Sequence, residues 1–386
     1  MCLQLLIMRS TKALIHKNNL KQNINNIRNL IEDNTKICIP VKANAYGHGA
    51  VQISKFLLEF GVDVLAVATL SEAEELRNAN IHAPVLLFSL PLPEEIPEII
   101  TWNVQPFVFT KDFIELLNLE AKKQKVMVQV HLKIDTGMGR IGCLPSQAAE
   151  FAKFITTQSN LSLAGCCTHL AVSDSLEEDA VLYTKKQIKL FNEAVLAIKK
   201  EGIDPGIRHC SATGGTLCYP EAQFDMIRPG LISYGYFPNT QIETKVKELH
   251  KGFDLYPVME LQTNITSIKT IMAGESISYG RIWKSNKATR IATIPVGYGD
   301  GLKRCLSPGL KVLIKGKTYP VVGRICMDQC MVDIDSDNDI KTGDVVTIFS
   351  DKKEAQSLNT QAKLANTITY EILTGIMPRV PRIYVD

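Results

Sequence analysis

The chain has 386 residues, of which 45% are hydrophobic and 22% are charged, a balance typical of a soluble globular protein with a full apolar core. Its 43 basic and 40 acidic side chains leave a net charge of +3, which excludes a strong global attraction to nucleic acid or to an anionic membrane. No apolar run approaches the ~20 residues that a membrane span requires, so we expect no membrane segment.

The N-terminal segment and the cysteines both indicate a cytoplasmic protein. The first apolar run has no basic residue ahead of it, is interrupted by Gln4 and leads to no A-x-A cleavage site, so we do not expect export. We interpret it as a short strand or as an extension ahead of Met8. The ten cysteines lack the regular spacing of a disulfide framework or a zinc site, and buried free thiols in a reducing compartment are expected instead.

Eight apolar, β-branched segments follow one another along the first two-thirds of the chain. They cover residues 36–42, 62–70, 83–90, 104–109, 126–135, 163–169, 206–212 and 224–230. Segments with helical spacing separate most of them. Nearly continuous apolar strands that alternate with helices indicate a parallel sheet covered on both faces. Eight such strands in about 220 residues predict a (β/α)8 barrel, with an open doubly wound sheet as the alternative.

The sequence changes in character after about residue 240. Segments rich in β-branched residues, threonine and glycine take over, and LIKGKTYPV has the pattern of a hairpin around Lys315 and Gly316. We therefore expect an α/β fold with an N-terminal (β/α)8 TIM-like barrel over residues 9–240. A mostly β C-terminal domain over residues 241–386 follows it, and pairing of the first residues with that domain is left open.

Polar residues lie at the ends of several predicted strands. They are Lys42, Asp135 followed by Arg140, His169, Ser211 and Arg228. Any one of them alone would be explained by a strand end that meets water. In a parallel barrel, however, the carboxyl ends of all strands meet at one rim, and this rim carries the active site. The pattern therefore predicts a site at this rim.

Lys42 ends the apolar run ICIPV and is followed by small residues, which leave room beside it. Burial should lower the pKa of this amine, and a neutral amine is what a Schiff base requires. The sequence has no G-x-x-x-x-G-K-[ST] motif, so Lys42 is not a phosphate-loop lysine. Taken alone, a structural lysine that reaches toward water is the simpler interpretation.

Two segments run from short strands into glycine-rich turns, namely HCSATGGT (209–216) and RPGLISYG (228–235). Backbone N–H groups at such turns, together with Ser211, can bind a phosphate. The alternative is that both are tight turns that need positive φ angles. A Schiff-base lysine on the same barrel rim as a phosphate site indicates pyridoxal phosphate (PLP) as the cofactor.

Eight motifs along the chain resemble those of bacterial alanine racemases. In order they are KANAYGHG, HLKIDTGMGRIG, THLAVSD, RPGLISYG, ISYGR, TIPVGYGDG, GRICMDQCMVDI and PRVPRIY, and they cover nearly the whole chain apart from its first eight residues. The resemblance implies a PLP-binding barrel followed by a β domain, and a head-to-tail homodimer whose two active sites share residues. It also implies racemisation of L-alanine and D-alanine, to supply D-alanine for peptidoglycan, without nucleic-acid or membrane partners.

By this resemblance, Lys42 holds PLP and exchanges the α-proton of the D-enantiomer, while Tyr279 from the other subunit exchanges that of the L-enantiomer. Two groups on opposite faces of the substrate Cα can run the reaction in both directions. Arg228 corresponds to the arginine at the pyridine nitrogen, which stays unprotonated because a guanidinium keeps its own proton. His169 corresponds to the histidine that links this arginine to the tyrosine.

The resemblance also assigns the remaining site residues. Arg140 and the backbone of Met327 correspond to contacts with the substrate carboxylate, and Lys133 to a lysine that is carbamylated in some members. The residues that correspond to the phosphate site are Tyr46, Ser211, Gly230, Leu231 and Tyr370. Tyr298 and Tyr370 correspond to residues that narrow the pocket and thereby keep the substrate small.

Several alternatives are left open. A broad-specificity amino-acid racemase of the same fold would differ in pocket size near Tyr298 and Tyr370. A PLP-dependent decarboxylase shares the barrel and β domain, and a PLP carrier has the barrel alone. A catabolic role is the alternative to peptidoglycan supply.

The acidic segment 333–344 resembles a calcium loop. However, Asn338 replaces the turn glycine and Asp344 the bidentate glutamate, so we favour a solvated acidic turn and expect no metal.

Overall fold

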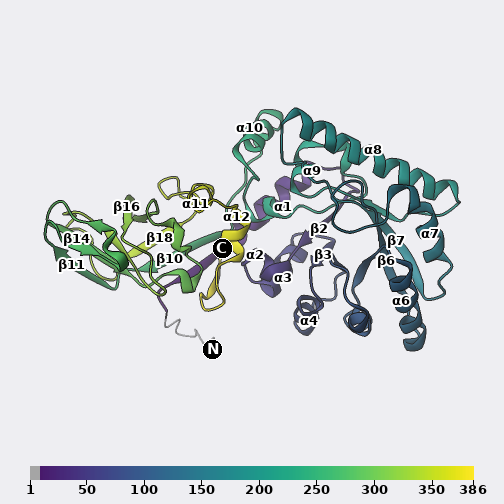
Figure 1. Cartoon of the computed structure of the whole chain (residues 1–386), viewed down its shortest axis with the longest axis horizontal. Helices are drawn as coiled ribbons and strands as arrows, with labels where there is room; N and C mark the ends of the chain where they lie inside the picture. Colours follow the sequence, from purple (N-terminus) through teal and green to yellow (C-terminus); the bar gives the residue numbers. More distant parts are fainter. Residues whose placement is uncertain (1–8) are drawn as a thin grey trace. The chain divides into compact units, whose positions relative to one another are not determined.

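The computed structural model describes residues 9–386, which form two compact units (Figure 1). The barrel unit comprises Lys21–Ala45 and Gly49–Leu255. The β unit comprises the described residues up to Leu20, the short segment Tyr46–His48, and Tyr256–Asp386. The interpretation of residues 1–8 as a strand or an extension lies outside the described residues.

The barrel unit contains a parallel sheet of eight strands in the order β8-β7-β6-β5-β4-β3-β2-β9. The strands are β2 (Lys36–Pro40), β3 (Val64–Val67), β4 (Val85–Leu87), β5 (Gln105–Val108), β6 (Val128–Lys133), β7 (Leu161–Cys167), β8 (Ile207–His209) and β9 (Met226–Ile227). Each strand overlaps the segment predicted for it. The N–H of Asp225 donates to the carbonyl of Arg208 at 3.1 Å, and this bond joins β8 to β9 at the two edges of the sheet. The predicted (β/α)8 barrel is therefore confirmed.

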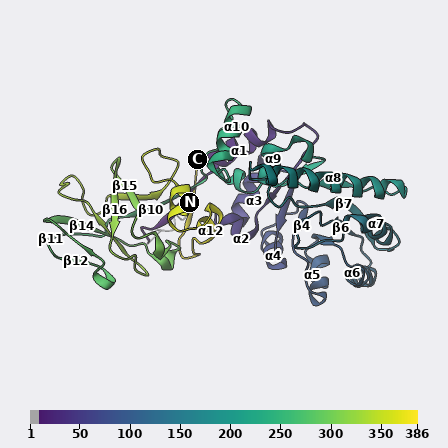
Figure 2. The ribbon, with the colours of Figure 1, turned by 45° about the horizontal axis from the view of Figure 1, so that its top comes forward.

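Helices of the barrel unit lie outside the strands (Figures 1 and 2). They are α1 (Lys17–Arg28), α3 (Ala50–Glu59), α4 (Leu70–Asn78), α5 (Ile96–Thr101), α6 (Lys111–Gln124), α7 (Ala148–Thr156), α8 (Glu178–Lys200), α9 (Thr213–Cys218) and α10 (Thr240–Leu249). The first residues of α1 belong to the β unit. Helix α8 packs against α7 and buries Phe191 and Ile198 on its inner face (Figure 2).

The interior of the barrel is mostly apolar. One buried cluster joins side chains from six of the strands, namely Cys38, Val64, Ala66, Leu86, Phe107, Cys167 and Met226. Strands that are buried on both faces become continuous apolar runs, which is why the sequence shows them so clearly.

The β unit is built on a nine-stranded sheet in the order β11-β14-β17-β16-β15-β18-β10-β1-β19. The strands are β1 (Lys12–His16), β10 (Met259–Asn264), β11 (Ser267–Ile271), β14 (Thr289–Ile294), β15 (Lys311–Ile314), β16 (Lys317–Val322), β17 (Cys330–Asp333), β18 (Val345–Phe349) and β19 (Arg382–Val385). Neighbouring strands are antiparallel except β1 and β19. The smaller elements are β12 (Ser276–Ile277), β13 (Trp283–Lys284), α11 (Leu358–Leu364) and α12 (Thr369–Thr374).

The predicted hairpin around Lys315 and Gly316 is confirmed, because it joins β15 to β16. Both turn residues have positive φ angles, 46° and 80°, as a two-residue hairpin turn requires. The mostly β character predicted for the C-terminal part of the chain is therefore present as well.

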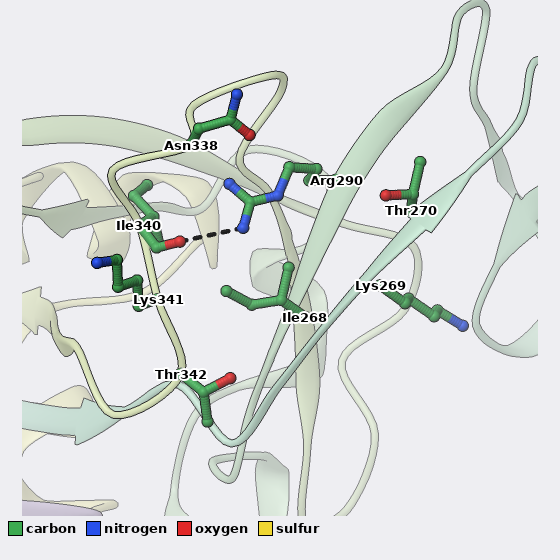
Figure 3. A pocket seen from close by; sticks show the side chains of 8 residues that line it. All are labelled: Ile268, Lys269, Thr270, Arg290, Asn338, Ile340, Lys341 and Thr342. Carbon is green, nitrogen blue, oxygen red and sulfur yellow. Dashed lines mark hydrogen bonds between the residues drawn. The ribbon is translucent and has the colours of Figure 1, made fainter.

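The acidic segment 333–344 is a loop whose carboxylates pair with lysines. Asp335 lies 2.7 Å from Lys287, and Asp344 lies 2.8 Å from Lys315. Arg290 also holds the loop by donating to the carbonyl of Ile340 at 3.1 Å, beside a surface cavity of about 470 Å³ (Figure 3). None of the eight residues that line this cavity is a predicted site residue. Within residues 9–386, no group of three or more histidine, cysteine or acidic side chains is placed to hold a metal ion.

Two further predictions concern the whole chain. No helix within the described residues is long and apolar enough to cross a membrane. The nine described cysteines all carry free thiols.

Candidate active site

Five predicted site residues gather at one end of the barrel. Lys42 follows β2, Lys133 ends β6, His169 follows β7, Arg228 follows β9, and Arg140 lies in the loop after β6. Burial lowers the pKa values of Lys42 and His169, and neighbouring positive charges add to this effect: Arg140 acts on Lys42, and the arginines and lysines of the group act on His169. The structure therefore brings these residues together as the sequence predicted, in a strongly cationic site.

A left-handed turn holds Lys42 in place. Ala43, Asn44 and Ala45 have φ angles of 51°, 55° and 51°, a conformation that costs roughly 1–2 kcal/mol for each L-residue. The carboxylate of Glu72 accepts a hydrogen bond from the backbone N–H of Ala43 at 2.7 Å. The side-chain oxygen of Asn44 accepts one from the backbone N–H of Ala50 at 2.8 Å. Such consecutive strain persists only where surrounding contacts impose it, and it is concentrated at functional sites.

The amine of Lys42 is partly withdrawn from water. Burial lowers its pKa, and the positive charge of Arg140 lowers it further. Its Nζ lies 6.0 Å from the centre of the Phe88 ring, which stacks on Phe107 with ring centres 5.4 Å apart. The environment therefore shifts the amine toward its neutral form, which is the form that acts as a nucleophile or as a base.

Arg228 is buried and its guanidinium is fixed from several sides. Nη1 lies 2.6 Å from Nδ1 of His209, and Nη2 donates to the carbonyls of Thr168 at 2.8 Å and Cys210 at 3.1 Å. These contacts leave the Nε–H and one Nη1–H without a hydrogen bond within residues 9–386. Two donors of a permanently charged group thus stay available for a ligand.

His169 is connected to Arg228 and held by helix α8. Its Nδ1 lies 3.5 Å from Nη2 of Arg228, and its carbonyl accepts from the side chain of Gln187 at 3.1 Å. The same Gln187 accepts from the N–H of Ala171 at 2.8 Å, so one buried side chain fixes the loop after β7. Burial and the positive charge of Arg228 keep the pKa of His169 well below its usual range, so the ring is neutral.

Lys133 is buried, and its Nζ makes no hydrogen bond within the described residues. Burial lowers its pKa to about 8. Asp135, two residues later, accepts from the N–H groups of Gly137 at 2.9 Å and Gly139 at 3.1 Å, and this turn leads to Arg140. The side chain of Arg140 is exposed, so it is free to meet an anionic group.

The predicted phosphate residues of the barrel unit separate into two groups. The hydroxyl of Ser211 is fully buried and donates to the carbonyl of Ala222 at 2.6 Å. Gly230 and Leu231, by contrast, lie beside the start of α9, where the N–H of Gly230 donates to Oγ1 of Thr213 at 3.2 Å. The first N–H groups of a helix have no partner inside it. Thr213 and the following Gly214 and Gly215 therefore present unused donors next to Gly230.

Five predicted site residues belong to the β unit. The rings of Tyr46 and Tyr370 pack with their centres 5.7 Å apart, and burial raises the pKa of Tyr46. Tyr279, Tyr298 and Met327 are instead exposed, Tyr279 to 69%. The loop that carries Tyr298 lies against that of Met327: the N–H of Tyr298 donates to the carbonyl of Cys326 at 3.0 Å. A Cβ at Gly297 would collide with the carbonyls of this second loop, which explains the glycine.

Sequence reasoning missed several residues that shape the site. Thr213 lies two positions after Ser211 in HCSATGGT, and its place directly before two glycines at a helix start was the available signal. His131 and His209 are polar residues within short buried strands, which is also visible in the sequence. Gln187 carries no such signal, because a glutamine on a long helix is normally exposed.

Comparison with known proteins agrees with this geometry. The sequence matches the alanine racemase N-terminal domain over residues 15–238 and the alanine racemase C-terminal domain over residues 258–384. It is 49% identical over 383 residues to the alanine racemase of Treponema denticola, covering 98% of this chain and 99% of that protein. The alanine racemase of Treponema pallidum subsp. pallidum is 40% identical over 384 residues, covering 98% of this chain and 100% of that protein.

Solved structures agree as well. The alanine racemase of Clostridium difficile superposes with a TM-score of 0.91 at 37% identity, covering 98% of this chain and 96% of that chain. The alanine racemase of Bacillus anthracis with bound L-Ala-P has a TM-score of 0.90 at 33% identity, with the same coverage. Because both domains match and the likeness spans nearly the whole chain, this chain is a racemase and belongs to the alanine racemase family.

Proposed function

We propose that the protein interconverts L-alanine and D-alanine with PLP as its cofactor, by two acid–base groups on opposite faces of the substrate. The observation that carries the proposal is the cationic group at the barrel rim, where Lys42 has a lowered pKa and Arg228 is fixed with two free donors. The carboxylate of a small amino acid and the phosphate of the cofactor match this charge.

The residues present fit PLP. Lys42 supplies the amine to which the cofactor would be joined, and Arg228 supplies N–H donors for its ring nitrogen. Ser211, Gly230 and Leu231 would hold its phosphate within the barrel unit, together with Thr213, whose hydroxyl accepts from the N–H of Gly230. When bound, PLP withdraws electrons from the substrate Cα and so makes the α-proton acidic.

The side chains of this chain then position the substrate and move its proton. Arg140, exposed at the end of its loop, would bind the substrate carboxylate. Lys42, whose pKa is lowered by burial and by Arg140, would take or return the α-proton on one face. Arg228 keeps its own proton, so it donates a hydrogen bond to the ring nitrogen without protonating it. His169, which is neutral, supports Arg228 from the side.

Tyr279 would serve the opposite face of the substrate in the other subunit of a head-to-tail homodimer. This assignment is supported by the exposure of Tyr279, Tyr298 and Met327. Their loops contact one another through Ser278 and Cys326, and exposed apolar side chains on neighbouring loops are typical of protein–protein contacts. The backbone N–H of Met327 also makes no hydrogen bond within the described residues, so it is available for a carboxylate.

A complementation experiment tests the shared sites. The variants Lys42→Ala and Tyr279→Phe, each impaired alone, are produced together with different tags, and the mixed dimers are compared with the wild type. If sites are shared, each mixed dimer holds one intact site of its two, so purified mixed dimers should show about half of the wild-type activity. No recovery in purified mixed dimers would show that both residues act within one subunit.

We further propose that Lys133 is carbamylated. Its neutral amine nitrogen would form a bond to the carbon of CO2 and release one proton, giving an anion near Arg140. The proposal is supported by the buried, unpaired Nζ and its pKa of about 8. ¹³C NMR in ¹³C-bicarbonate should show a carbamate signal that is absent from Lys133→Met. Identical spectra of the two proteins would refute it.

We propose a cytoplasmic enzyme that supplies D-alanine for peptidoglycan. The free thiols of the nine described cysteines suit a reducing compartment.

Broad substrate specificity is the main alternative to a racemase specific for alanine, and it is tested by comparing kcat/KM for alanine, serine and larger amino acids. No observation favours a decarboxylase or a PLP carrier.

The central experiment is incubation with L-alanine in D2O, with the α-proton followed by NMR and D-alanine by chiral chromatography. Loss of the α-proton together with formation of D-alanine is the expected result. Proton exchange without inversion would show that only one base works. No exchange in PLP-loaded protein would overturn the proposed substrate.

A further inference from the structure

Two buried histidines connect Arg228 to the opposite end of the barrel. Nδ1 of His131 lies 2.9 Å from Nε2 of His209, and Nδ1 of His209 lies 2.6 Å from Nη1 of Arg228. On the other side, Nε2 of His131 lies 3.1 Å from the side-chain oxygen of Gln105. All four ring nitrogens are therefore hydrogen-bonded. We call Gln105, His131, His209 and Arg228 the histidine relay.

The relay crosses the barrel from end to end. Arg228 directly follows β9 at the rim that carries the site, whereas Gln105 is the first residue of β5. Gln105 donates to the side-chain oxygen of Gln129 at 2.6 Å, and Gln129 is exposed. The histidines themselves are no more than 1% exposed, and Phe107 packs beside both rings.

The structure leaves space for the contact between the two rings. A Cβ on Gly165, the residue of β7 paired with His131, would lie 2.5 Å from Nδ1 of that histidine. The same Cβ would lie still closer to the backbone carbonyl oxygen of Ile207, so any other side chain at Gly165 would displace both the ring and β8. The glycine allows the two imidazoles to approach across β7 with their ring centres 5.0 Å apart.

The chemistry of Arg228 fixes the direction of every bond in the relay. A guanidinium can only donate, so Nδ1 of His209 must accept and its proton sits on Nε2. Nε2 of His209 then donates to Nδ1 of His131, which places the proton of His131 on its own Nε2. That proton is donated to Gln105, whose amide nitrogen donates to Gln129. One permanent charge at the rim thus sets two tautomers in the barrel interior.

Protonation of either ring would break this order, because two N–H groups would then face each other. The charged groups around the pair all oppose protonation: Arg228 acts on both rings and Lys133 on His209. Burial and Arg228 together lower the pKa of His131 to about 3, and the pKa of His209 is well below its usual range.

We propose that His131 is a positioning residue for Arg228: by accepting the Nε2–H of His209 it fixes the tautomer of that ring, and thereby the orientation of the guanidinium. The carbonyls of Thr168 and Cys210 occupy Nη2, and His209 occupies one N–H of Nη1. The relay therefore determines which N–H groups face the ligand. The effect on ligand binding rests on the proposed role of Arg228 at the cofactor ring. The assignment of the two histidine tautomers does not depend on that role.

The first test reads the tautomers in PLP-free protein. The chain has seven histidines, so long-range ¹H–¹⁵N spectra of histidine-labelled protein are simple enough to assign by single substitutions. We expect His131 and His209 to carry their protons on Nε2 and to stay neutral from about pH 6 to about pH 8. A proton on Nδ1 of His209, or titration of either ring in this range, would overturn the proposal.

The second test compares three variants. His131→Leu removes the acceptor, so His209 should lose its single tautomer and PLP should bind about tenfold more weakly. His131→Asn keeps an acceptor oxygen near the position of Nδ1. It should therefore preserve the single tautomer of His209 and keep the PLP affinity within about threefold of the wild type. Gln105→Leu removes only the far end of the relay and should resemble His131→Asn. Equal effects of His131→Leu and His131→Asn would overturn the positioning role.

A spectroscopic reading separates positioning from stability. The ¹⁵N shift of ring-labelled PLP should change in His131→Leu and stay close to wild type in His131→Asn, whereas melting temperatures should fall in both. An unchanged ¹⁵N shift of the PLP ring in His131→Leu would contradict the proposal.

Failure of the proposed function is distinguishable from failure of this inference. It would show as an absence of PLP binding in the wild type, whereas the histidine tautomers would still be measurable. If His131→Leu does not fold, His131→Phe replaces it, because a phenyl ring also removes the acceptor while filling the space of the imidazole; PLP binding by His131→Phe equal to that of the wild type would contradict the proposal.

Discussion

Arg379 forms an ion pair with a fully buried carboxylate: its Nε lies 2.8 Å from Oδ1 of Asp300. The other oxygen of Asp300 accepts from the N–H of Gly297 at 3.0 Å, and Arg9 pairs with the same side chain. Arg379 also donates to the carbonyl of Met327 at 3.4 Å. One carboxylate thus joins the loop of Tyr298 to that of Met327, and it ties three sequence motifs into one surface of the β unit.

Removal of this carboxylate should destabilise the protein and loosen both loops. We expect Asp300→Asn to lower the free energy of unfolding by about 2–4 kcal/mol, because it leaves two arginines beside a neutral buried group. KM for alanine should rise in parallel. Asp328→Asn is the control, since Asp328 pairs with the same Arg379 at 2.8 Å but is 60% exposed, and it should cost less than about 1 kcal/mol. Urea unfolding measures the free energy of unfolding of both variants, and steady-state kinetics measures their KM. Equal losses of stability in Asp300→Asn and Asp328→Asn would disprove the special role of Asp300.

Substitution of Lys42 should remove covalent cofactor attachment. After borohydride reduction and digestion, mass spectrometry should find phosphopyridoxyl on the Lys42 peptide of the wild type and on no peptide of Lys42→Ala. Activity should fall at least about a hundredfold, because both attachment and one base are lost. Lys36→Ala, at the exposed opposite end of β2, is the control and should behave as wild type. Attachment at another lysine in the wild type would refute the assignment.

Tyr279→Phe should impair the two directions unequally. Exchange of the α-proton from L-alanine in D2O should fall far more than exchange from D-alanine, because the lost hydroxyl serves one face only. Initial exchange rates from each enantiomer, measured by NMR before racemisation, decide the question. Tyr256→Phe, in the same unit, is the control. Equal losses in the two directions would show that Tyr279 is not the second base.

The lowered pKa of Lys133 should appear in the pH dependence of stability. In the folded protein the amine loses its proton near pH 8, whereas in the unfolded chain it does so near its ordinary value of 10.5. Between these values the unfolded state binds more protons, so the free energy of unfolding should rise with pH. Lys133→Met should reduce this rise. Urea unfolding of both proteins, PLP-free and in CO2-free buffer, tests it, and parallel curves would contradict the pKa shift.

Three histidines with lowered pKa values should make the protein sensitive to mild acid. The pKa values of His131, His169 and His209 are all far below the ordinary 6.5 in the folded state. Below about pH 6.5 the unfolded chain therefore binds protons that the folded state does not, and each histidine costs about 1.4 kcal/mol per pH unit. Unfolding free energies at about pH 7, 6 and 5 should show this fall. His131→Asn should reduce the slope by about one third, and an unchanged slope would place that histidine in its ordinary range.

The sequence determined the elements and most of the catalytic candidates. The strands of the barrel are visible because burial on both faces makes each of them a continuous apolar run. Lys42, His169 and Arg228 stand out because a polar residue at the end of such a run is unusual, and the barrel brings all of these ends to one rim. Family motifs then supplied the roles that spacing alone left open.

Other features were decided only by the tertiary structure. His131 and His209 lie 78 positions apart, and a closed barrel with the register of β6, β7 and β8 is needed to bring their rings together. Asp300 and Arg379 likewise meet only through the folding of the β unit. The left-handed turn at Ala43–Ala45 contradicts the local preference of these residues, and bonds from Glu72 and Asn44 hold it there. Periodicity is a property of neighbours along the chain, whereas hydrogen-bond partners, tautomers and backbone strain depend on segments that are distant in sequence.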